Sequence, residues 1–127
     1  MKFNHLKGYE SVTLPTETID GKRYYTTPDG NHYPSVTSVT GLLNRKSIAA
    51  WRKWVGEEQA NKISSQAANR GTRYHYMMED FINNIDIDEK LSKATPLDQM
   101  MFNQTRDITE KLGDIYMLEG SLYSDEL

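Results

Sequence analysis

The chain has 127 residues, a net charge of −3 and a pI near 5.6, and it contains no cysteine. This length suits one domain with one core, and the lack of cysteine excludes disulfides and thiolate metal sites. The acidic balance excludes a nucleic-acid footprint spread over the whole surface, so any such site must be a local basic patch. No apolar run reaches membrane-spanning length, and the N-terminus lacks the apolar core of a signal peptide. We therefore expect a cytoplasmic protein that is neither secreted nor bound to a membrane.

Residues 1–34 are predicted to form a loop and then a β-hairpin. The segment 21–27 is rich in strand-forming residues. The sequence Pro-Asp-Gly at 28–30 is typical of a turn, and residues 31–33 can return as the second strand.

Two short helices are predicted next, one capped by Ser35 and one by Ser47. Arg52, Lys53 and Trp54 lie away from the inner face of the second helix. A basic helix with a half-exposed tryptophan can contact a phosphate backbone or stack on a base. The alternative, which we prefer at this point, is a cationic face beside a core tryptophan.

A longer helix is predicted from Glu57 to a break at Gly71. Glycine suits the end of one helix, and Thr72 can cap the start of the next. His75 and Glu79 are four residues apart, so they lie one turn from each other at the edge of an apolar stripe. Taken alone, a histidine in this position is more often a half-buried packing residue than a ligand.

The last helix is predicted to start at Thr95-Pro96 and to end at Gly113. Residues 114–123 alternate in the manner of a strand, and Glu119 on one face of it belongs either to a rim or to a site. The pattern predicts an α+β protein with a single domain over residues 1–127, made of a loop and hairpin in 1–34, helices in 35–112 and a strand in 114–123.

Three motifs, in this order, resemble those of one nuclease family. They are residues 34–40, Trp51-Arg52, and Arg70-Gly71-Thr72-x-x-His75-x-x-x-Glu79. Together they resemble the N-terminal part of RecB-like nucleases of the PD-(D/E)XK superfamily, among them phage-type exonucleases and the mitochondrial genome maintenance exonuclease. The resemblance covers roughly residues 33–127. It implies a restriction-endonuclease-like fold and a DNA exonuclease that hydrolyses phosphodiester bonds with Mg²⁺ or Mn²⁺. It also implies a role in DNA repair and recombination in a bacterial or phage-infected cell.

The resemblance assigns roles to six side chains. His75 matches the histidine that joins the metal site of this family, and Glu79 matches an acidic position on the same helix, so both are predicted catalytic residues. An imidazole ligand favours manganese more than an all-oxygen site does. Glu119 is a secondary candidate. The DNA backbone is predicted to contact three arginines: Arg52, Arg70 and Arg73.

The chain departs from the family where the catalytic core should follow. Relatives carry an Asp and then a Glu/Asp-x-Lys after the stretch that resembles residues 118–127. We therefore interpret the chain as an N-terminal fragment that does not cut DNA by itself. A lone C-terminal strand has an unpaired edge, which predicts self-association through residues 115–123.

Two other classes of function stay open. The chain can be a non-enzymatic helical module that binds DNA through basic residues: Arg52, Lys53, Arg70 and Arg73. It can instead be an interaction subunit that supplies His75 to a catalytic partner chain.

Overall fold

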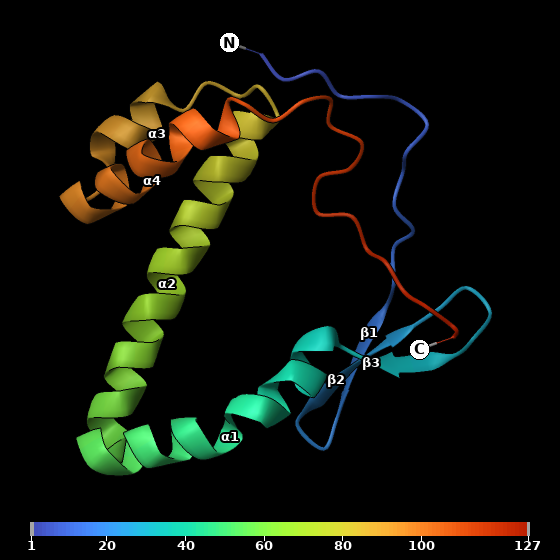
Figure 1. Cartoon of the computed structure of the whole chain (residues 1–127), viewed down its shortest axis with the longest axis vertical. Helices are drawn as coiled ribbons and strands as arrows, with labels where there is room; N and C mark the ends of the chain where they lie inside the picture. The colour runs from blue at the N-terminus through green and yellow to red at the C-terminus, as the bar shows by residue number, and fades with distance from the viewer. Residues whose placement is uncertain (1, 127) are drawn as a thin grey trace. The chain divides into compact units, whose positions relative to one another are not determined.

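The computed structural model describes residues 2–126 and combines helices with a small antiparallel sheet (Figure 1). In chain order its elements are β1 (Thr16–Ile19), β2 (Lys22–Thr26), β3 (His32–Pro34), α1 (Val36–Val55), α2 (Glu57–Ile82), α3 (Asp88–Lys93) and α4 (Pro96–Thr109). The predicted α+β class is confirmed at this level. That the fold is a restriction-endonuclease-like nuclease stays a prediction.

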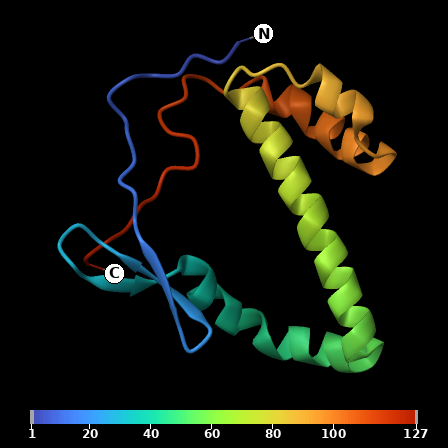
Figure 2. The same cartoon turned by 180° about the vertical axis from the view of Figure 1, so that it is seen from behind.

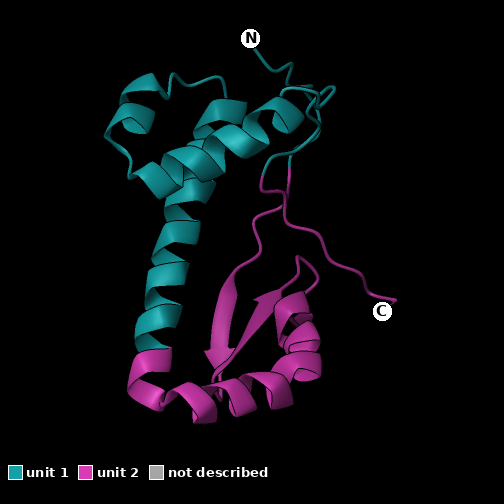
Figure 3. Ribbon diagram, turned by 60° about the vertical axis from the view of Figure 1, so that its left-hand side comes forward, with its two compact units in different colours: residues 1–10, 61–118 teal, residues 11–60, 119–127 magenta. Residues whose placement is uncertain are grey.

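Contacts within the chain divide it into two compact units (Figure 3). Unit 1 contains residues 1–10 and 61–118, and unit 2 contains residues 11–60 and 119–127. Two contact units can lie within one domain, so the single domain over residues 1–127 stays a prediction.

The sheet belongs to unit 2 and has the order β1-β2-β3. The hairpin predicted around residues 28–30 is confirmed, since β2 and β3 pair in antiparallel fashion. Strand β1 was not predicted; it pairs with β2 so that Ile19 lies opposite Lys22. The two residues between them, Asp20 and Gly21, have φ angles of 52° and 76°. An Asp-Gly pair with positive φ at both positions is typical of a two-residue hairpin turn.

Helix α1 is one helix of 20 residues, where two short helices were predicted. Ser35 is its N-cap, because its side chain accepts a hydrogen bond from the backbone N–H of Ser38 at 3.2 Å. Ser47 lies inside α1 and caps nothing, since helix-forming residues continue on both sides of it. The helix ends at Gly56, whose φ of 90° few other residues adopt.

Helix α2 has 26 residues. Both views of the chain show it as one unbroken helix (Figures 1 and 2). The predicted break at Gly71 is therefore wrong, and Thr72 lies in the helix interior instead of capping a new one. A single glycine costs a helix only about 1 kcal/mol relative to alanine. The packing of the following turns offsets this cost, because tertiary contacts supply most helix stability in proteins.

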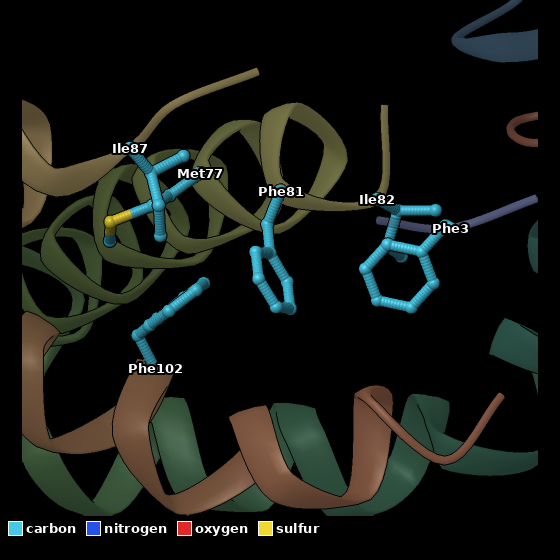
Figure 4. Packing of buried hydrophobic residues seen from close by; sticks show 6 residues of the cluster. All are labelled: Phe3, Met77, Phe81, Ile82, Ile87 and Phe102. Atoms are coloured by element: carbon cyan, nitrogen blue, oxygen red, sulfur yellow. The ribbon is translucent and has the colours of Figure 1, made fainter. Parts of the chain in front are cut away.

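The core of unit 1 lies where the end of α2 meets α4 and the N-terminal segment (Figure 4). Phe81 is at its centre, with the ring of Phe3 at 5.2 Å and that of Phe102 at 5.5 Å, both edge to face. The buried members of this core are Phe3, Met77, Phe81, Ile82, Ile87 and Phe102. This core fixes which side of α2 is turned inward.

The predicted start of the last helix is confirmed. Thr95 is the N-cap of α4 and accepts a hydrogen bond from the backbone N–H of Asp98 at 3.2 Å, with Pro96 at the first helical position. The helix ends at Thr109, earlier than the predicted Gly113.

The C-terminal strand predicted for residues 114–123 is wrong. Within the part of the chain that the structure describes, Ile115 alone forms a β-bridge there, parallel to His5. Glu119 has a φ of 58°, which an extended strand does not allow. The strand edge on which the predicted self-association depends is thus not formed by residues 114–123. None of the helices described is long and apolar enough to cross a membrane.

Candidate functional site

His75 and Glu79 occupy successive turns of α2, as their spacing predicts. His75 is exposed and Glu79 is half-buried. Each precedes a core residue, Met77 or Phe81, by two positions, and two residues turn a helix by about 200°. Ile82, also in the core, follows His75 by seven residues, which brings it back to nearly the same side of the helix. His75 and Glu79 therefore lie at the edge of the core-facing side of α2, where His75 is exposed.

These two side chains do not by themselves fit a magnesium or manganese site. Residues 2–126 contain no group of three or more His, Cys, Asp or Glu side chains placed to hold a metal ion. Mg²⁺ prefers octahedral coordination mainly by oxygen, with carboxylates as its usual protein ligands. One imidazole and one carboxylate leave most of that coordination to other groups, so we derive no catalytic step from them.

Arg73, a predicted DNA contact, is held by a buried carboxylate. Its Nε lies 2.8 Å from Oδ2 of Asp98, which is only 3% exposed. The hydrogen bond from Arg73 lowers the pKa of Asp98 against the opposing effect of burial, and the charge of Arg70 nearby lowers it further. The same hydrogen bond raises the pKa of Arg73. The pair joins α2 to α4, which gives Arg73 a structural role.

Arg52 is also engaged by a carboxylate. Its guanidinium donates two hydrogen bonds to Oε2 of Glu57, from Nη2 at 2.7 Å and from Nε at 3.2 Å. This contact raises the pKa of Arg52 and lowers that of Glu57. The pair spans the bend at Gly56 and joins the end of α1 to the start of α2. A phosphate that binds Arg52 or Arg73 must compete with these carboxylates, so their predicted DNA contacts stay predictions.

Other side chains were misjudged or missed from the sequence. Glu119 is exposed and lies in a bend, so it is not on a core strand. Asp98 lies just after the predicted helix start at Thr95-Pro96, and nothing in the local sequence indicated that it would be buried. Trp51 is half-buried, whereas Trp54 is 84% exposed. Trp54 thus has the free ring face that the stacking alternative requires.

Comparisons with family models, with curated proteins and with solved structures gave no match for this chain. The resemblance to RecB-like nucleases therefore depends on its sequence motifs alone.

Proposed function

We propose that this chain is part of a metal-dependent DNA nuclease similar to RecB-like nucleases, in which His75 and Glu79 contribute to the metal site. The observation that carries the proposal is that the two side chains lie on successive turns of α2, at the edge of its core-facing side, with His75 exposed and Glu79 half-buried. The remaining ligands would be supplied from outside residues 2–126, since these hold no complete metal-binding group.

Gly71 supports a ligand-facing role for the same side of α2. It precedes His75 by four residues, so Gly71, His75 and Glu79 recur at one-turn spacing. An added β-carbon at Gly71 would meet nothing within 4 Å beyond its two chain neighbours and the backbone of its own helix, so packing does not require glycine there. A glycine in a helix costs stability, and one of its uses is to let a ligand approach the backbone closely.

Paramagnetic line broadening by Mn²⁺ tests the metal proposal residue by residue. The chain has three histidines, and the other two are internal controls. His5 donates from Nε2 to the carbonyl of Ile82 at 2.6 Å, and Nδ1 of His32 forms a hydrogen bond with Thr26 at 3.1 Å. We expect the ring signals of His75 to broaden at lower Mn²⁺ concentration than those of His5 and His32.

Substituting Glu79 by glutamine provides the matched variant, because it keeps the side-chain shape and removes the charge. We expect Glu79→Gln to shift the broadening of His75 to higher Mn²⁺ concentration. Equal broadening of all three histidines, or broadening of His75 that Glu79→Gln leaves unchanged, would refute the metal site.

A non-enzymatic DNA-binding module is the second candidate, favoured by the exposed ring of Trp54 beside the exposed Lys53. It predicts a gel shift of labelled DNA by the 127-residue chain without metal, which weakens as salt is raised. Arg70 is the predicted DNA contact that can be tested most directly, because Arg52 and Arg73 have structural roles. Arg70→Ala should weaken this shift, and a shift that it leaves unchanged would exclude Arg70 as a contact.

A further inference from the structure

Helix α1 carries an apolar stripe that the structure leaves uncovered. The stripe consists of Val36, Val39, Leu43, Ala50 and Trp54, whose spacings of three, four and seven residues place them on one side of the helix. None of the residues of α1, all of which are described, is buried. Val36, Leu43 and Trp54 are 77%, 85% and 84% exposed. At 1.5 Å per residue the stripe is about 27 Å long.

The charges beside the stripe are all positive. No Asp or Glu occurs between Val36 and Val55. Lys46 and Lys53 follow Leu43 and Ala50 by three residues each, so both flank the same edge of the stripe, and both are exposed. A partner that covers the stripe therefore meets apolar side chains in its middle and two ammonium groups along one edge.

We propose that the α1 stripe docks an acidic amphipathic helix of another protein. Exposed apolar side chains that gather on one side of a helix, interrupted here by Ser47, indicate a surface that another apolar surface covers. The three- and four-residue spacing of the stripe matches the apolar face of a second helix. Carboxylates on that helix would pair with Lys46 and Lys53. This docking goes beyond the proposed nuclease function and does not depend on His75.

Other occupants fit the same face less well. A second copy of α1 would bring lysines toward lysines, with no carboxylate on either helix to pair with them. A nucleic-acid strand could stack on Trp54 and contact Lys46 and Lys53. It would leave Val36 and Leu43 exposed to water, because a phosphate backbone does not cover aliphatic side chains.

Two synthetic helical peptides with the same leucine seam test the proposal. One carries glutamate beside the seam and the other carries lysine, and each is titrated as a labelled peptide with the full chain. We expect saturable binding of the glutamate peptide, weakened by salt, and at least about tenfold weaker binding of the lysine peptide. Leu43→Glu should weaken binding of the glutamate peptide at least about tenfold. Ile48→Glu is the matched control, because Ile48 is 51% exposed on another side of α1.

Charge reversal provides the readout that a merely structural effect would not produce. The double variant Lys46→Glu/Lys53→Glu should lose affinity for the glutamate peptide and gain affinity for the lysine peptide, with an unchanged helical circular dichroism spectrum. Equal binding of both peptides, or of neither, would overturn the proposal. A dimer of the chain that Leu43→Glu dissociates would assign the stripe to a second copy. Oligothymidylate that displaces the glutamate peptide and needs Trp54 would assign it to nucleic acid.

Discussion

Replacing Gly71 by alanine should stabilise the protein, although the sequence suggests a glycine that ends a helix. In the structure Gly71 lies inside α2, and its added β-carbon would meet nothing within 4 Å beyond its two chain neighbours and the backbone of its own helix. The substitution therefore exchanges the poorest helix former apart from proline for the best, without a clash. We expect the free energy of unfolding to rise by about 0.5–1 kcal/mol.

The same substitution at Gly56 should lower the free energy of unfolding instead. Gly56 also has open space around its α-carbon, but its φ of 90° lies in a region that residues with a β-carbon avoid. The cost comes from the backbone alone, and we expect a loss of about 1–2 kcal/mol. The two variants make the same chemical change, and the backbone conformation at each glycine decides whether the free energy of unfolding rises or falls.

Urea unfolding measures both variants against the parent chain. Domains of this size are stable by about 5–15 kcal/mol, so shifts near 1 kcal/mol move the midpoint measurably while the slope m should not change. A destabilised Gly71→Ala variant would show that the helix breaks at Gly71, against the continuous α2. If a ligand approaches the backbone there, Gly71→Ala should also weaken DNA or Mn²⁺ binding while it raises stability.

Three further predictions concern the site and its scaffold. Tyr74→Ala should cost about 2–3 kcal/mol, because it removes a half-buried ring and a 2.7 Å hydrogen bond to Thr105, whereas His75→Ala should stay within about 0.5 kcal/mol. Thermal melting compares the two variants, and equal losses would make His75 part of the scaffold. The native pKa of Asp98 is lowered by its hydrogen bond with Arg73, so the pair stabilises the fold above the ordinary pKa of 3.8 and loses this effect as pH falls through the lower native value. In Asp98→Asn the free energy of unfolding should therefore fall less steeply as the pH is lowered, which urea unfolding at several acidic pH values measures. An unchanged dependence on pH would contradict this. Finally, the purified 127-residue chain with Mn²⁺ should leave labelled DNA intact, and chelator-sensitive cleavage would show the prediction to be wrong.

Helix starts could be predicted from the sequence because their signals are local. Thr95 and Pro96 occupy the two positions that define the start of α4, and Ser35 does the same for α1. Helix ends were harder to predict. Gly71 and Ser47 resemble boundaries when only their neighbours are considered, yet both lie inside helices. Whether a helix continues through a weak position depends on what its later turns pack against, and that information is not local.

The strands show the same limit. The Asp20-Gly21 pair between β1 and β2 is a hairpin signal that the sequence contains and that we missed. Residues 114–123 have a strand-like alternation, but a strand also needs a neighbour with which to pair. The structure provides a single bridge at Ile115, and the positive φ of Glu119 interrupts any extension.

Among the candidate site residues, those related by helix periodicity were predicted best. His75 and Glu79 lie on one side of α2 because four residues make about one turn, whatever the rest of the chain does. The arginines depend on distant partners. The carboxylate that engages Arg73 comes from Asp98, 25 residues further along the chain. No spacing rule within α2 could show that Asp98 would be buried beside Arg73.

Some residues of α2 stabilise the fold by packing or by an ion pair, and others do not. The inner side supplies Met77 and Phe81 to the core, and Arg73 ties the helix to α4. Gly71 and His75, at the edge of that side, are exposed, and the glycine lowers helix stability although packing does not require it. Marginally stable proteins retain such costs where a ligand or a partner makes use of them. That cost is the physical reason to look for a ligand near Gly71 and His75 of α2.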